Sequence, residues 1–158
     1  MTEDERAAQS ARAVEHLLAA LSSTALRTVA AYASFGTEPS TAELLARLRA
    51  DDVEVLLPAV LASNDLTWMD DAGVDRGVDA ISGCQLVIVP GLAADRSGHR
   101  LGRGGGSYDR ALARVAAEVP RVLLLFDGEV VDEVPVEPHD ATVSHVALPS
   151  GLVRTGDA

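Results

Sequence analysis

Short apolar segments alternate along this chain with longer segments of helical periodicity, and this alternation constrains the fold more than any other feature. Leu86–Val89 is an unbroken apolar run, typical of a strand that is buried on both faces. Val29–Ser34, Val53–Leu57, Val122–Phe126 and Val143–Val146 are also expected to be strands. Strands that alternate with helices indicate βαβ units. We therefore predict a three-layer α/β/α fold with a mainly parallel central sheet.

Three segments carry helical signals. Apolar residues recur at helical spacing in Asp4–Leu21, which predicts a long first helix. Ser40 and Glu43 match a capping box, so a second helix is expected to begin at Ser40. A third helix is expected to present one apolar face between Tyr108 and Val119. Pro58 is expected to end the strand that precedes it, because proline cannot donate to a ladder.

The composition suits one domain over residues 1–158. With 47% hydrophobic residues the chain can bury a core. No apolar run approaches the roughly 18 residues that a membrane span needs, and the polar, acidic amino terminus is unlike a secretory signal. The one cysteine, Cys84, excludes an intrachain disulfide and is expected to be a small buried residue. The expected protein is a cytoplasmic monomer that binds no membrane.

Charge is distributed unevenly along the chain. The formal net charge of −11 has the wrong sign for a protein that binds a phosphate backbone, so nucleic acid is excluded as a partner. Between Pro90 and Val115, however, five arginines stand against two aspartates. Such a positive segment can focus a small anionic ligand into one cleft, or it can be a solvated surface. Charge alone leaves both interpretations open.

A glycine-rich loop, residues 102–106, precedes the third expected helix. Its glycines expose backbone N–H groups and tolerate positive φ, so the loop can wrap around an anion. A Walker loop would need a lysine, which this chain lacks, and a dinucleotide fingerprint would follow its strand directly. A flexible hairpin tip is the alternative. The candidate phosphate-binding residues are Arg100, Gly102, Arg103, Gly104, Gly105 and Gly106.

The predicted architecture also indicates where a ligand should bind. In open α/β sheets ligands occupy the crevice outside the carboxyl ends of the strands. Two loops of this chain meet that condition, Gly36–Pro39 after the first expected strand and Gly91–Tyr108 after Leu86–Val89. We expect the functional site between them.

The longer segment around the glycine loop is more specific than the loop alone. Val89–Leu112 reads VPGLAADRSGHRLGRGGGSYDRAL and resembles the signature of the 5-formyltetrahydrofolate cyclo-ligase family. Ala30–Thr41, Val53–Pro58 and Val131–Asp140 resemble three further segments of that family, in the family's order. The resemblance extends from Val29 to about Leu148.

The resemblance implies an activity and roles for particular residues. The family joins the N5-formyl carbon of 5-formyltetrahydrofolate to N10, with ATP and Mg²⁺, to give 5,10-methenyltetrahydrofolate, ADP and phosphate. Arg103, as a catalytic residue, and the glycine loop would hold the ATP phosphates, and Asp109 would bind the Mg²⁺. Glu38, Ser107 and Tyr108 would contact the folate. ATP and 5-formyltetrahydrofolate are thus the implied small-molecule partners.

Some positions depart from the family pattern. Ala94 stands where the family has phenylalanine, and Ser107 stands where it has the first of two tyrosines. The Ser107 hydroxyl is expected to cap the helix that follows. The family's amino-terminal basic helix has no lysine-bearing counterpart here. A non-catalytic relative that binds nucleotide or folate therefore stays open, as does a sugar-phosphate isomerase-like domain, although no acid–base set for the latter is found.

Overall fold

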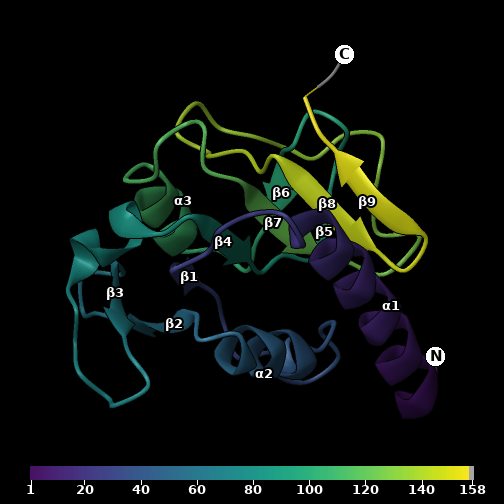
Figure 1. The fold of residues 1–158 in the computed structure, drawn as a ribbon. Coiled ribbons are helices and arrows are strands. Elements are labelled where there is room, and N and C mark those ends of the chain that lie inside the picture. The colour runs from purple at the N-terminus through teal and green to yellow at the C-terminus, as the bar shows by residue number, and fades with distance from the viewer. Residues whose placement is uncertain (157–158) are drawn as a thin grey trace.

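Strands and helices alternate in a computed structural model that describes residues 1–156 (Figure 1). Most of the predicted elements are present, with bounds that differ by a few residues. In chain order the elements are α1 (Glu3–Leu21), β1 (Thr28–Ala30), α2 (Ala42–Ala50), β2 (Glu54–Val60), β3 (Leu66–Met69), the 3₁₀ helix η1 (Val78–Gly83), β4 (Leu86–Val89), β5 (Ala93–Ala94), β6 (Arg100–Leu101), α3 (Ser107–Leu112), β7 (Arg121–Leu124), β8 (His145–Leu148) and β9 (Gly151–Arg154).

The main sheet has seven strands in the order β3–β2–β1–β4–β7–β8–β9. Its five inner strands are parallel to one another, whereas β3 and β9 run antiparallel at the two edges. β5 and β6 form a separate two-stranded hairpin. The prediction of a mainly parallel sheet is confirmed.

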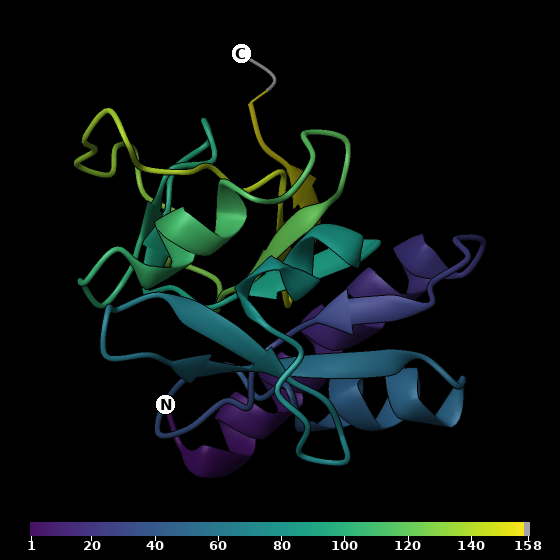
Figure 2. The same ribbon diagram turned by 90° about the vertical axis from the view of Figure 1, so that its left-hand side faces the viewer.

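Helices cover both faces of this sheet. α1 and α2 lie on one face, and α3 and η1 lie on the other (Figure 2). β4 shows the division residue by residue: Leu86 and Ile88 pack against the α1–α2 side, and Val87 and Val89 against the α3 side. All four side chains are fully buried, as the unbroken apolar run predicted. The three-layer α/β/α architecture is confirmed.

Helix capping differs from the prediction. The capping box expected at Ser40 and Glu43 is wrong, because α2 begins after Thr41, which makes no side-chain cap bond. The Thr41 hydroxyl instead donates to the carbonyl oxygen of Tyr32 (2.7 Å) and accepts from the N–H of Ser34 (3.1 Å). These bonds fix the shape of the β1–α2 loop, so Thr41 serves the loop rather than the helix.

Two element ends were also predicted wrongly. β2 continues through Pro58, which pairs with Trp68 of β3, because β2 has by then passed its last partner in β1 and needs no donor on that side. α3 ends at Leu112 rather than near Val119, because the N–H groups of Arg114 and Val115 bond three residues back, to the carbonyl oxygens of Ala111 and Leu112, and do not continue the α-helical pattern. The antiparallel edge strand β9 was not predicted.

The remaining expectations concern Cys84 and membranes. Cys84 is buried, as predicted, and burial raises the pKa of its thiol to about 11. A thiol of that pKa is protonated at neutral pH and is a poor nucleophile. Within residues 1–156, no helix combines the length and the apolar character that a bilayer span needs.

Candidate active site

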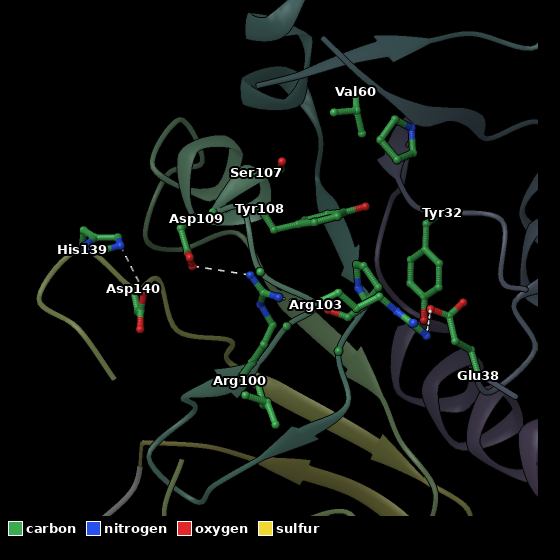
Figure 3. Close-up of a pocket in the computed structure, with 18 of the residues that line it drawn as sticks. Tyr32, Glu38, Val60, Arg100, Arg103, Ser107, Tyr108, Asp109, His139 and Asp140 are labelled. Atoms are coloured by element: carbon green, nitrogen blue, oxygen red, sulfur yellow. Dashed lines mark hydrogen bonds and ion pairs between the residues drawn. The ribbon is translucent and has the colours of Figure 1, made fainter. Parts of the chain in front are cut away.

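The carboxyl ends of β1, β2 and β4 open onto a cleft of about 890 Å³ (Figure 3). This volume lies within the roughly 300–1,000 Å³ typical of small-molecule sites. The β1–α2 loop forms one side of the cleft, and the glycine loop with the start of α3 forms another. The cleft therefore lies between the two loops at the carboxyl ends of the strands, as predicted.

Every residue that the sequence proposed for the site lines this one cleft. They come from two segments that are more than sixty positions apart in the chain, so only the fold brings them together. Their individual roles stay predictions. The residues are Glu38, Arg100, Gly102, Arg103, Gly104, Gly105, Gly106, Ser107, Tyr108 and Asp109.

The glycine loop adopts a backbone that other residues rarely adopt. Gly104, Gly105 and Gly106 have φ of +95°, +85° and +70° in succession, as the expectation of positive φ required. Gly102 has a different reason to be glycine: a Cβ there would lie 2.7 Å from Nη1 of Arg100. The loop thus combines unusual backbone geometry with close packing of an arginine.

Arg103 joins the two loops across the cleft. Its Nη2 lies 3.3 Å from Oε1 of Glu38, and its guanidinium lies 5.1 Å from the centroid of the Phe35 ring. The other carboxylate oxygen of Glu38 accepts from the Phe35 N–H at 3.0 Å. The Glu38 side chain is 9% exposed, whereas that of Arg103 is 55% exposed. Arg103 is therefore accessible to a ligand while Glu38 is anchored in its own loop.

Arg100 lies deeper in the cleft. Its side chain is 7% exposed, its Nη2 is 3.5 Å from Oδ1 of Asp109, and its guanidinium is 5.6 Å from the centre of the Tyr108 ring. Nη1 also donates to the carbonyl oxygen of Pro90 at 3.3 Å. Burial lowers the pKa of Arg100, and Asp109 opposes that shift. A guanidinium stays charged under these conditions, so the cleft holds a fixed positive charge.

Two buried polar atoms of this group have no hydrogen-bond partner among the described residues: Nε of Arg100 and the hydroxyl of Tyr108. Burial raises the pKa of the Tyr108 hydroxyl, so it remains a donor at neutral pH. Buried donors are nearly always paired in native proteins. Both atoms are consistent with a polar ligand in the cleft.

Asp109 can contribute to a metal site only together with a ligand. Its Oδ1 accepts from the Ala141 N–H at 3.0 Å and from Arg100. Within residues 1–156, no three His, Cys, Asp or Glu side chains are grouped to hold a metal ion. Mg²⁺ commonly uses one or two carboxylates together with substrate phosphates and water. A single carboxylate beside the glycine loop fits a Mg²⁺ ion that arrives with a nucleotide.

Ser107 does not cap α3, so that prediction is wrong. Gly106 occupies the cap position, and the Ser107 hydroxyl donates to the carbonyl oxygen of Asn64 at 2.6 Å. The bond links α3 to the turn after β2. The helix starts one residue earlier than a Ser107 cap would require, because Gly106 supplies the left-handed backbone at that point.

Aromatic residues of the cleft were partly missed from the sequence. Tyr32, Phe35 and Tyr108 line it, and they are three of the five aromatic residues in the chain. Tyr108 projects from α3 toward the side that carries Tyr32 (Figure 3). Val60 and Val136 add exposed apolar surface to the rim. Aromatic residues this rare, placed directly after a strand, were the signal that could have identified Tyr32 and Phe35.

His139 and Asp140 also border the cleft. Asp140 accepts from the Glu137 N–H at 2.8 Å, and its own N–H donates to the Glu137 carbonyl oxygen at 3.0 Å. His139 lies 3.6 Å from the Asp140 carboxylate. Asp140 therefore stabilises a turn.

A structural comparison agrees with this fold. The structure of a 5,10-methenyltetrahydrofolate synthetase from Mycoplasma pneumoniae superposes with a TM-score of 0.82, at 17% sequence identity, over 93% of this chain and 88% of that one. At that identity the match demonstrates the shared fold.

Sequence comparisons identify the family. The family model of 5-formyltetrahydrofolate cyclo-ligases matches residues 1–149, which adds α1 to the segment where the resemblance was first noted. A 5-formyltetrahydrofolate cyclo-ligase of Mycolicibacterium smegmatis is 37% identical over 150 residues, covering 80% of this chain and 76% of the relative. One from Escherichia coli is 30% identical over 142 residues, covering 78% of each. The chain therefore belongs to the 5-formyltetrahydrofolate cyclo-ligase family, whose members are enzymes of the ligase class.

Proposed function

We propose that this protein converts 5-formyltetrahydrofolate to 5,10-methenyltetrahydrofolate, with ATP as co-substrate and Mg²⁺ as cofactor. The observation that carries the proposal is that one cleft holds the glycine loop, two arginines and an aromatic wall formed by Tyr32, Phe35 and Tyr108. One part of this cleft suits phosphate oxygens and the other suits flat rings. The proposed setting is a cytoplasmic monomer, as the sequence predicts.

The proposed reaction needs activation of the formyl oxygen. An amide-like oxygen is a poor leaving group, so the γ-phosphoryl group of ATP is first transferred to it and ADP is formed. The lone pair of N10 then attacks the formyl carbon, N10 loses its proton to solvent, the carbon–oxygen bond breaks and phosphate leaves. Phosphoryl transfer depends mainly on positioning and on neutralising the developing negative charge. These two requirements define what the protein must supply.

The glycine loop and Arg103 are proposed to hold the phosphates. Three successive glycines with positive φ leave their N–H groups unshielded, and Arg103 adds a planar fork on an accessible side chain. Asp109 would hold the Mg²⁺ ion together with phosphate oxygens. When bound, the ion would neutralise charge on the transferring phosphoryl group. Arg100 keeps a positive charge below the loop.

The aromatic wall is proposed to hold the folate. Tyr32, Phe35 and Tyr108 offer faces for the pteridine and aminobenzoyl rings, and Val60 extends the apolar surface at the rim. Glu38 is anchored by Phe35 and Arg103, which points its carboxylate at the same space. The Tyr108 hydroxyl, which has no partner among residues 1–156, is a donor for a polar atom of the folate.

A second candidate is binding of nucleotide or folate without turnover. Glu38 and Asp109 each form an ion pair with an arginine, so the two carboxylates proposed to bind folate and metal are already engaged. The two candidates differ in one direct measurement, which is product formation.

Purified protein with ATP, Mg²⁺ and 5-formyltetrahydrofolate is expected to form the methenyl product, followed by its near-ultraviolet absorbance. Removing the metal with a chelator is expected to lower the rate by about a hundredfold or more, because charge neutralisation by a metal contributes several kcal/mol. Product that forms without ATP, or no product at any protein concentration, would contradict the proposed ATP-dependent activity. ATP binding measured by calorimetry in the absence of product would favour the non-catalytic candidate.

Ser107→Tyr is expected to tighten folate binding several-fold. The substitution adds an aromatic face to the cleft, and such a ring contact contributes roughly 0.5–1.5 kcal/mol beyond area burial. ATP affinity should stay nearly unchanged, because its proposed contacts come from the glycines and Arg103. The melting temperature should fall slightly, since the hydrogen bond to Asn64 is lost. Calorimetric titration with each ligand and a melting curve measure all three effects.

Ser107→Ala is the matched control. It removes the same hydrogen bond without adding a ring, so it should melt lower and bind folate no better than the wild type. Weaker folate binding in Ser107→Tyr than in Ser107→Ala would remove the folate from this end of the glycine loop.

A further inference from the structure

α3 and the residues just after it are tied to the turn between β2 and β3. The Ser107 hydroxyl and Nη1 of Arg110 donate to the carbonyl oxygen of Asn64, at 2.6 and 3.3 Å. Nη1 and Nη2 of Arg114 donate to the two carboxylate oxygens of Asp65, at 2.8 and 2.6 Å. The three donor side chains follow helical spacing and so face one side. The contact is a set of four hydrogen bonds between the α3 segment and the turn that joins β2 to β3.

The Asp65–Arg114 pair is the strongest part of this contact. Two parallel N–H···O bonds give it the fork geometry in which guanidinium and carboxylate match best. The side chains are 18% and 27% exposed, so the pair is partly shielded from solvent. Its hydrogen bonds lower the pKa of Asp65 to about 2. The carboxylate is therefore ionised at any pH at which the protein is assayed.

Both ends of the contact lead to the cleft. On one side, two hydrogen bonds close the turn directly after Val60, which lines the cleft. The Leu61 N–H donates to the Asp65 carbonyl oxygen (2.8 Å), and the Asn64 N–H donates to the Leu61 carbonyl oxygen (2.9 Å). On the other side, Arg110 also donates to the carbonyl oxygen of Gly105 at 3.0 Å, inside the glycine loop. Asp65 and Arg114 themselves are not lining residues.

α3 depends on such a contact. It has six residues, and helices this short are not stable on their own. Three glycines with positive φ precede it, and glycine loses more conformational freedom on folding than any other residue. The helix nevertheless carries Tyr108 and Asp109 into the cleft. Tertiary bonds must therefore set its position.

We propose that Asp65 and Arg114 are positioning residues of the active site. Their ion pair fixes α3 against the turn between β2 and β3 and so sets where Tyr108 and the glycine loop meet the substrates. The inference rests on the proposed function for its catalytic consequence. The structural consequence, a glycine loop and helix held in place by a side-chain pair outside the cleft, does not.

Asp65→Asn tests the catalytic consequence. A mutation far from the chemistry that displaces the reacting groups by about 1 Å can lower a rate by up to about a hundredfold. We therefore expect kcat to fall by about 10- to 100-fold and the KM values for both substrates to change by less than about threefold. The pH dependence of kcat should keep its shape above pH 5, because a group that is always ionised adds no titration. Asp71→Asn is the matched control, since Asp71 pairs with Arg49 at 2.9 Å outside the cleft; its kcat should stay within about twofold of the wild type.

Hydrogen exchange of the amides in residues 104–112 tests the structural consequence without requiring turnover. Exchange there should be at least about tenfold faster in Asp65→Asn and unchanged in Asp71→Asn. If Asp65→Asn does not fold, Arg114→Lys takes its place, because lysine keeps the charge without the fork.

The outcomes separate the two proposals. An inactive wild type would contradict the proposed function. Hydrogen exchange at residues 104–112 would then still decide whether the Asp65–Arg114 pair holds the helix. Faster exchange with an unchanged kcat means that the pair is only structural, and unchanged exchange means that it holds nothing; either result overturns the positioning role.

Discussion

Arg103→Ala is expected to lower the ATP-dependent rate of methenyl product formation by about a hundredfold or more. Removing one preorganised charge partner of a transition state typically costs about 10²- to 10³-fold in kcat. Arg103 fits that description because its side chain is 55% exposed in the cleft and directly follows Gly102 in the proposed phosphate loop. The loss should fall on kcat and on ATP binding. Steady-state kinetics with each substrate varied in turn measures both.

Arg103→Lys should recover only part of this rate. A lysine ammonium is a point charge and cannot reproduce two parallel hydrogen bonds to phosphate oxygens. Arg49→Ala is the control, since it also removes an ion-paired arginine but lies outside the cleft. Wild-type rates in Arg103→Ala would show that this arginine only ties the glycine loop to Glu38 and takes no part in catalysis.

Gly98→Ala is expected to destabilise the fold strongly. A Cβ at this position would clash with the carbonyl oxygen of Val143 and lie 2.8 Å from Oγ1 of Thr155, and φ is +91°. Backbone strain contributes about 1–3 kcal/mol and overpacking about 1–3 kcal/mol more. For a chain of this size the sum lowers the melting temperature by roughly 5–20 °C. Differential scanning calorimetry or denaturant unfolding measures the loss.

Gly73→Ala separates the two causes. Gly73 has a similar φ of +79°, but no atom of the described residues lies within 4 Å of a Cβ there, so only the strain remains, about 1–3 kcal/mol. Equal losses in the two variants would mean that the close contact with Val143 relaxes without cost. A smaller loss for Gly73→Ala would confirm that Gly98 is required by packing between the β5–β6 region and the end of the chain.

Local sequence patterns specified the inner strands and the ligand-binding edge. The run Leu86–Val89 predicted a doubly buried strand, and β4 is that strand, residue for residue. The glycine loop and the loop before α2 were both placed at the carboxyl ends of strands, where the cleft lies. These predictions succeeded because apolar periodicity reflects burial directly, and because parallel strands bring all their carboxyl ends to one edge.

Element ends were predicted less well, since they depend on neighbours distant in sequence. Thr41 does not cap α2, because its hydroxyl is bonded to Tyr32 and Ser34 instead. Pro58 does not end β2, because β1 on one side of it has already ended while β3 on the other side still pairs with it. In both places the residue's local preference was overridden by a partner that only the fold supplies.

The sequence by itself determined the α/β class, the positive φ of the glycine loop, the site's position and, through its motifs, the family. Tertiary structure alone decided which side chains meet there. Arg103 faces Glu38 across the cleft, and beside the cleft Arg114 holds Asp65 in the turn between β2 and β3. These partners lie 65 and 49 residues apart in the chain. Helix and strand periodicity extend over only a few residues, so contacts at such separations follow from the order and packing of the strands rather than from any local pattern.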